Sequence, residues 1–172
     1  MAGVVFQGFV LDEDSGHLLR SMRSVARQIV SLSQIGITKG CGSPDEAIIQ
    51  HARNAGRIVV TGNTWDYTSA IRDAALKCRP GVCYEGGGLI SVPNGTWSYP
   101  FKQIERTMTL DDAPIGWEDV YLCNLHIRVN RNHSFDVLRL PLCEYFIRDH
   151  ALNCTRCIAL SVETQSISVD RV

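Results

Sequence analysis

The chain has 172 residues, of which 45% are hydrophobic and 20% charged, and its formal net charge is −1. This length and apolar share predict a globular domain, alone or with an annex, and exclude a generally disordered chain. No apolar run approaches the roughly 20 residues of a membrane-spanning helix, and the apolar opening has no basic lead. We therefore expect neither a membrane span nor a secretory signal. Seven cysteines without such a signal favour a reducing, cytoplasmic location.

The first half of the chain alternates predicted strands and helices. The apolar run at 4–11 predicts a strand buried on both faces, and a helix with Ser15 as its cap follows. The later elements are a weaker strand at 29–35, a helix from Ser43-Pro44 to a left-handed cap at Gly56, a strand at 57–61, a helix at roughly 68–77 and a strand at 82–84. This alternation is typical of a doubly wound, mostly parallel α/β sheet.

The pattern changes after the glycines at 86–88. Apolar residues alternate from Tyr121 to Val129, which predicts a half-buried antiparallel strand, and residues 135–142 predict the other strand of a hairpin. Another strand is expected at 158–162. We therefore divide the chain into an α/β domain at residues 1–92 and a β-rich annex, or sheet extension, at residues 93–172.

Acidic residues stand at the ends of the predicted strands or in the helix starts beside them. They are Asp12, Asp14, Asp45 and Asp66, with Asn63 close to the last of them. In an open α/β sheet, ligands gather outside the carboxyl ends of the strands, and clustered carboxylates repel one another unless a cation offsets their charge. Oxygen ligands favour Mg²⁺ or Mn²⁺, which activate water and stabilise charge in phosphodiester cleavage.

Each of these residues also has an ordinary structural explanation. Asp45, like its neighbour Glu46, sits in a first helical turn, where a carboxylate complements the helix dipole. The acidic run at 12–14 could be a solvated turn, and Asp66 could cap the following helix. Capping and metal binding are compatible, and the order of the whole set along the chain favours the metal site.

The segments that carry these acids resemble the PIN-like superfamily. They are Phe9–Asp14, Gly42–Ile48 and Gly56–Tyr67. The likeness extends over about residues 4–92, and it is to the short bacterial and archaeal PIN-like proteins related to toxin ribonucleases. It implies a doubly wound nuclease fold in which clustered acids hold Mg²⁺ or Mn²⁺ and hydrolyse single-stranded RNA, in many members as the toxin of a toxin–antitoxin pair.

The resemblance also implies roles for individual residues. The metal ligands would be Asp12, Asp14, Asp45 and Asp66, and the catalytic set Asp12, Asp45, Asp66 and Asn63. Asp14 stands where the family usually has Asn, and Asn63 stands where many members have Asp. These departures leave open a weaker or single-metal site, and with it a second hypothesis: a catalytically weak scaffold that binds RNA or a protein partner.

RNA contact is expected from a local patch, because the net charge is close to zero. Arg20, Arg23 and Arg27 recur at i, i+3 and i+7 on one helix face, and Trp65 stands beside the predicted site, where it could stack a base. The alternatives are a solvated face or an oligomer contact for the arginines, and packing for Trp65. We expect single-stranded RNA, an antitoxin protein and further copies of this chain as partners, and no membrane.

One cysteine pair, Cys154 and Cys157, has the spacing of half a zinc site. Its possible partners are Cys143, His150 and the Cys123-x-x-His126 pair. The chain shows no second clean Cys-x-x-Cys, so structural zinc is the lesser alternative and Mg²⁺ or Mn²⁺ the expected cofactor.

Overall fold

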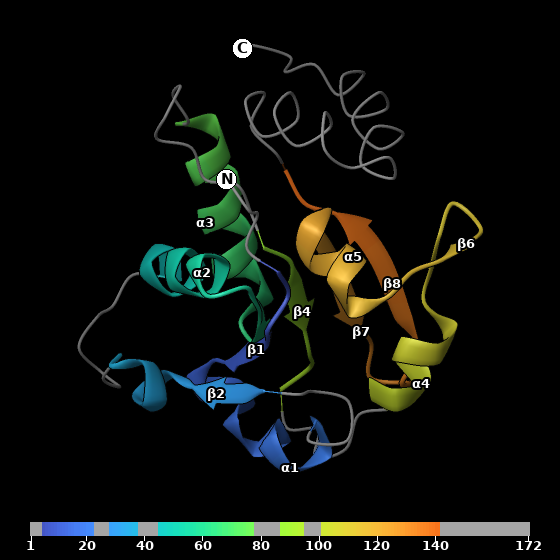
Figure 1. Cartoon of the computed structure of the whole chain (residues 1–172), viewed down its shortest axis with the longest axis horizontal. Helices are drawn as coiled ribbons and strands as arrows, with labels where there is room; N and C mark the ends of the chain where they lie inside the picture. Colours follow the sequence, from blue (N-terminus) through green and yellow to red (C-terminus); the bar gives the residue numbers. More distant parts are fainter. Residues whose placement is uncertain (1–4, 23–27, 38–44, 78–86, 95–100, 142–172) are drawn as a thin grey trace.

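The structure is a computed structural model that describes residues 5–22, 28–37, 45–77, 87–94 and 101–141 (Figure 1). A six-stranded sheet in the order β2-β1-β3-β4-β7-β8 forms its middle layer. The strands are β1 (Gly8–Leu11), β2 (Ile29–Ser31), β3 (Arg57–Thr61), β4 (Leu89–Ser91), β7 (Leu125–Val129) and β8 (Phe135–Arg139). All neighbours pair in parallel except β8, which is antiparallel to β7. The mixed α/β class and the mostly parallel sheet are therefore confirmed.

Helices cover both faces of this sheet (Figure 1). On one face pack α2 (Asp45–Asn54) and α3 (Thr64–Leu76). On the other pack the 3-10 helix η1 (Glu13–Leu18), α1 (Leu19–Met22), α4 (Phe101–Thr107) and α5 (Trp117–Leu122). A second 3-10 helix, η2 (Leu32–Ile35), follows β2, and a short ribbon of β5 (Thr109–Leu110) and β6 (Ala113–Pro114) precedes α5. This layering is compatible with a doubly wound fold, and none of the described helices is long and apolar enough to cross a bilayer.

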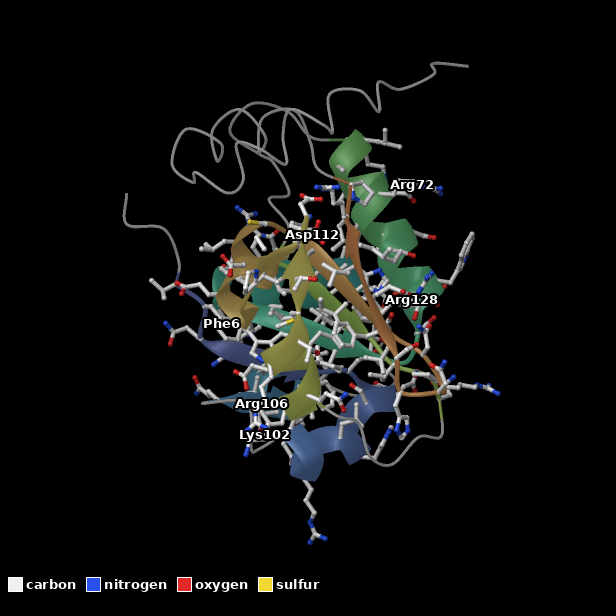
Figure 2. All side chains as sticks on the ribbon, turned by 90° about the vertical axis from the view of Figure 1, so that its right-hand side faces the viewer. Phe6, Arg72, Lys102, Arg106, Asp112 and Arg128 are labelled. Atoms are coloured by element: carbon white, nitrogen blue, oxygen red, sulfur yellow. The ribbon has the colours of Figure 1, made fainter. Side chains whose placement is uncertain are left out.

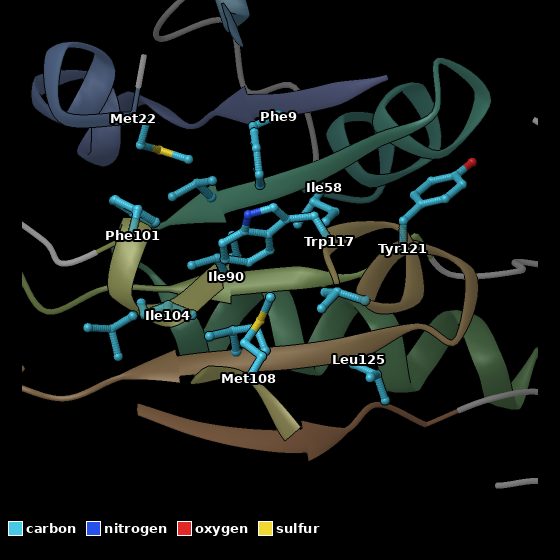
Figure 3. Packing of buried hydrophobic residues seen from close by; sticks show 14 of the residues in the cluster. Phe9, Met22, Ile58, Ile90, Phe101, Ile104, Met108, Trp117, Tyr121 and Leu125 are labelled. Atoms are coloured by element: carbon cyan, nitrogen blue, oxygen red, sulfur yellow. The ribbon is translucent and has the colours of Figure 1, made fainter. Parts of the chain in front are cut away.

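The two covered faces produce two hydrophobic cores, because successive side chains of a strand point to opposite faces. The larger core lies under α4 and α5. Trp117 sits in the middle of it and packs edge-on against Phe9, with ring centroids 5.4 Å apart (Figure 3). The smaller core lies under α2 and α3 and includes Ile49, Val59 and Ile71. Both faces of β1 and β3 are therefore buried, as the continuous apolar runs predicted.

The centre of the sheet agrees closely with the sequence. The strand at 57–61 is confirmed residue by residue. The preceding helix buries Ile48, Ile49 and Ala52 and is followed by Gly56, whose φ of +70° is left-handed as predicted. The Ser43-Pro44 start and the strand at 82–84 lie outside the described residues. A fourth parallel strand, β4, lies beyond the glycines at 86–88.

Three predicted helix and strand boundaries are wrong at the edges of this region. Asp12, not Ser15, caps the first helix, because its carboxylate accepts the Glu13 N–H at the very end of β1. Ser15 is instead buried, and its hydroxyl donates to the Val60 carbonyl at 2.6 Å. The helix expected at about 68 begins at Thr64, and the strand expected to run to residue 35 gives way to η2 after Ser31.

In the predicted annex, the hairpin is confirmed by the antiparallel pairing of β7 and β8. The strand expected from Tyr121 is wrong in its first half, because α5 occupies 117–122 and buries Trp117, Val120 and Tyr121 at helical spacing. The strand that follows pairs in parallel with β4. The sheet thus continues across the predicted boundary at 92/93, while the strand expected at 158–162 lies outside the described residues.

Replacing Trp117 by Ala should lower the free energy of unfolding by about 3–5 kcal/mol, because the change empties the middle of the larger core. The matched control is Trp65→Ala. Trp65 is 75% exposed, so its loss should change stability by no more than about 0.5 kcal/mol. Urea unfolding followed by circular dichroism measures both, and equal losses in the two variants would contradict this assignment of the core.

Candidate functional site

The carboxyl ends of the parallel strands set polar side chains in a row. The smaller core contains one residue from each of three neighbouring strands, namely Val10, Val59 and Leu89. Two positions further along each strand, on the same face, come three buried polar residues, Asp12, Thr61 and Ser91. The strand register pairs Thr61 directly with Ser91. The edge at which the sequence predicted acids therefore also carries two hydroxyl groups.

Asp12 is fixed at this edge by hydrogen bonds to both of its carboxylate oxygens. Oδ1 accepts the Glu13 N–H at 2.7 Å, and Oδ2 accepts the Thr61 hydroxyl at 2.9 Å. Thr61 Oγ1 in turn accepts the Asn63 N–H at 2.9 Å. Asp12 is only 8% exposed. Thr61, which sequence reasoning gave no role, therefore orients Asp12 and shapes the turn that leads into α3.

Asp45 and Asp66 belong to the first turns of α2 and α3. Burial raises the pKa of Asp45 above its ordinary value, and the negative charges of Asp12 and Asp66 raise it further. A charge affects a neighbouring titration to this extent only at short range. Three carboxylates from separate parts of the chain therefore act on one another at the sheet edge.

These carboxylates do not form a ready-made coordination shell. In the described ranges, no three His, Cys, Asp or Glu side chains are grouped closely enough to hold a metal ion. Asp66 accepts a hydrogen bond from the amide of Asn63, with Nδ2 2.6 Å from Oδ2. The oxygen donors suit Mg²⁺ or Mn²⁺, and a cation would offset their repulsion.

Two further polar residues approach over Gly62. A Cβ atom at position 62 would collide with the side-chain oxygen of Asn94 and come within 3.3 Å of the Asp14 Cβ. Glycine is therefore needed there for Asp14 and Asn94 to lie together. Asp14 is exposed beside the site, as a supplementary ligand should be. Sequence reasoning missed Asn94, whose only local signal is a turn after β4.

Tyr67 is the second residue that sequence reasoning missed. It is fully buried in the first turn of α3, and its hydroxyl interacts with the Asp12 carboxylate. Burial raises the pKa of Tyr67 well above its ordinary value, and the charges of Asp12 and Asp45 and a hydrogen bond to the Asp12 carboxylate raise it further. The phenol therefore stays protonated and lies within reach of the acidic site. The apolar burial of its ring hid this polar end from the sequence pattern.

The predicted RNA contacts are only partly within the described residues. Trp65 is 75% exposed, so its indole is not part of a core, and Arg20 is exposed on α1. Arg23 and Arg27 lie outside the described ranges. Figure 2 shows other cations at separate places: Arg72 on α3, Arg128 on β7, and Lys102 with Arg106 on α4. The cations labelled there therefore lie on three separate elements.

The zinc alternative loses one pair of its possible ligands. Cys123 is buried in the larger core, whereas His126 faces the other side of the sheet and its Nε2 lies 2.6 Å from Ser91 Oγ. The two side chains therefore cannot share an ion. The remaining candidates, Cys143, His150, Cys154 and Cys157, lie outside the described residues.

Comparison of the chain with protein-family models, with curated proteins and with solved structures finds no match. The PIN-like resemblance therefore stays a prediction.

Asp45→Asn should raise the melting temperature of the cation-free protein at pH 7, because it removes a charge that Asp12 and Asp66 repel. Glu46→Gln is the matched control: it lies in the same helical turn, and both variants lose about 0.3–1 kcal/mol of favourable interaction with the helix dipole. The gain of Asp45→Asn over wild type should shrink as pH falls, since protonation of Asp45 removes the same charge. Thermal unfolding in EDTA across a pH series checks this, and a gain shared by Glu46→Gln would count against local repulsion.

Acid should weaken the fold through His126. Burial, and then the positive charge of Arg128, lowers the pKa of His126 to about 4 from an ordinary 6.5. Between these values the unfolded chain binds a proton that the folded protein does not, so stability falls as pH drops from about 6.5 to about 4. His126→Gln should abolish about 2–3 kcal/mol of this loss. Urea unfolding at pH 7 and pH 4.5 measures it; parallel losses in variant and wild type would contradict the assignment.

Proposed function

We propose that this protein is a divalent-cation-dependent phosphodiesterase that hydrolyses single-stranded RNA. The observation that carries the proposal is the electrostatic coupling of Asp45 to Asp12 and Asp66 at the carboxyl edge of the sheet. A carboxylate whose pKa is raised by burial and by carboxylates of other elements is typical of a functional site. The PIN-like resemblance supplies the substrate class, and the exposed Trp65 beside Asp66 fits a stacked base.

Each residue of the edge has a distinct part in this proposal. Asp12 is the fixed ligand, because Glu13 and Thr61 hold its two oxygens in place. Asp45 and Asp66 supply carboxylates from the first turns of α2 and α3, and Asp14 adds a carboxylate from the solvent side. Mg²⁺ or Mn²⁺, when bound, supplies a Lewis acid and an activated water for attack on phosphorus. Asn63 positions Asp66 through its 2.6 Å hydrogen bond.

One observation favours a second function, that of a scaffold which binds RNA or a protein without cleaving it. The Asn63 amide donates a hydrogen bond to Asp66. Among the described residues, no three acidic side chains lie close enough together to hold a metal ion. A site that stays in this arrangement would hold a cation weakly. The expected antitoxin partner and self-association are compatible with either function.

Incubation of single-stranded RNA with the protein in Mn²⁺ or Mg²⁺ should yield cleavage that EDTA abolishes. Asp12→Asn should reduce the rate by about 100-fold or more, since it removes the fixed charge of the site. Asp66→Asn, at an exposed position, is a second variant that leaves the core untouched. Glu46→Gln is the matched acidic control and should retain the wild-type rate.

The outcomes separate the two functions. Cleavage that persists in EDTA or in Asp12→Asn would contradict the proposed enzyme. RNA binding that is insensitive to cations, with no cleavage at any protein concentration, would support the binding scaffold instead. A gel-based cleavage assay and a fluorescence-anisotropy binding assay on the same labelled RNA give both measurements.

A further inference from the structure

A pocket lies at the end of β1 opposite to the acidic edge. Its walls include Gly8 at the start of β1, Gln28 just before β2, and residues of α4 and α5. Its volume of about 730 Å³ is typical of small-molecule sites in proteins. Asp12 comes four positions after Gly8, a distance of roughly 13 Å along an extended strand. The pocket is therefore separate from the candidate site and from the function proposed for it.

One wall of the pocket contains a buried hydrogen-bond donor without a partner. Trp117 lines the pocket and is 4% exposed, and its Nε1 has no hydrogen-bond partner among the described residues. The indole packs edge-on against Phe9 (Figure 3), and an aromatic ring is a weak substitute for an acceptor atom. Buried indole N–H groups usually have a partner. The N–H of Trp117 therefore indicates an acceptor atom on a bound molecule.

The charged residues of the pocket indicate a cation. Among the described residues that line it, the charged ones are Glu105 of α4 and Glu118 of α5, and both are exposed. Neither has an ion-pair partner in the described part of the chain. Lys102 and Arg106 lie on the same helix as Glu105 (Figure 2) but do not line the pocket. Two unpaired carboxylates favour a positively charged group on the ligand.

The rest of the pocket suits an apolar body. Val5 is 57% exposed, and Phe6 is partly buried against the larger core. Both line the pocket beside Gly8, where a Cβ atom would overlap the carbonyl oxygen of Gln28. The start of β1 therefore presents bare backbone next to an aromatic side chain. An aromatic ring packs well against Phe6, and an ammonium group near that ring gains a cation–π attraction.

We propose that this pocket binds a small organic amine with an aromatic body, an ammonium group at one end and an oxygen acceptor at the other. The oxygen accepts the Trp117 N–H, the body packs beside Phe6, and the ammonium pairs with Glu105 and Glu118. No covalent bond changes. The chain thereby has a ligand site at the end of the sheet that the acidic residues do not occupy.

Tyramine is the probe, because it joins a phenol oxygen, an aromatic ring and an ammonium group. Phenethylamine lacks the hydroxyl, and hydroxyphenylpropionate has a carboxylate in place of the ammonium. Calorimetry on the full chain should show that tyramine binds, that phenethylamine binds about fivefold more weakly, and that hydroxyphenylpropionate does not bind. In heteronuclear NMR spectra, tyramine should shift the indole N–H signal of Trp117 and leave that of the exposed Trp65 unchanged.

The charged wall is tested by a variant that carries Glu105→Gln and Glu118→Gln. Both positions are exposed, so the fold should be kept. Tyramine binding should weaken about fivefold or more at low salt, where exposed ion pairs are strongest. The matched control carries Glu46→Gln and Asp73→Asn, which remove the same charge from exposed positions on α2 and α3. This control should bind tyramine as wild type does.

Each other result overturns the inference. Absence of tyramine binding to wild type would show that the pocket does not take this class of ligand. Equal binding of tyramine and phenethylamine would show that the Trp117 N–H has no part in recognition. A shift of the Trp65 signal instead, or equal losses in the two double variants, would place tyramine elsewhere. None of these measurements involves RNA or a divalent cation, so their outcome is independent of the proposed function.

Discussion

The carboxylate of Asp12 is held at the end of β1, and the arrangement of the candidate site follows from that constraint. Hydrogen bonds from Glu13 and Thr61 to its two oxygens prevent the charge from turning away from the sheet edge. Burial raises the pKa of Asp45, and the negative charge of Asp12 raises it further. Tyr67 presents a buried hydroxyl to the same charge. The fixed negative charge of Asp12 thus acts on residues of both α2 and α3.

This crowding opposes folding. Like charges at short range destabilise the folded protein. Two hydrophobic cores, one on each face of the sheet, offset these local costs. Asparagine at position 45 would remove part of this repulsion. Residues that lower the stability of an otherwise well-packed structure are most often residues kept for a function.

The sequence predicted the parts of this fold that a single short-range signal decides. The strand at 57–61 and the turn at Gly56 follow from a bounded apolar run and a left-handed glycine. The strand predicted from Tyr121 is wrong in its first half, because the alternating apolar residues there also fit a helical spacing from Trp117. Only packing against the sheet decides between strand and helix. The first helix began early, because the Asp12 cap forms through a side-chain bond that no periodicity records.

The candidate site likewise contains residues that the sequence predicts and residues that it does not. Acids at strand ends are readable, since topology brings those ends together whatever the details. The roles of Thr61, Tyr67 and Asn94 depend on which side chain meets which across the edge, and that is a property of the register and of the close approach over Gly62. Residue types that are ordinary in a strand, a core or a turn give no signal of it in the sequence.

The polar row changes character from one side of the sheet to the other. At β1 and β3 it is negative, whereas on β4 and β7 Ser91 and His126 form a neutral pair, because burial and Arg128 keep His126 unprotonated at neutral pH. Arg128 is itself paired with Asp136 at 2.9 Å. This end of the row therefore adds little positive charge to the acidic end. An edge of that charge repels a phosphodiester until a cation has reduced its potential, so the proposed function requires cation binding to precede RNA binding.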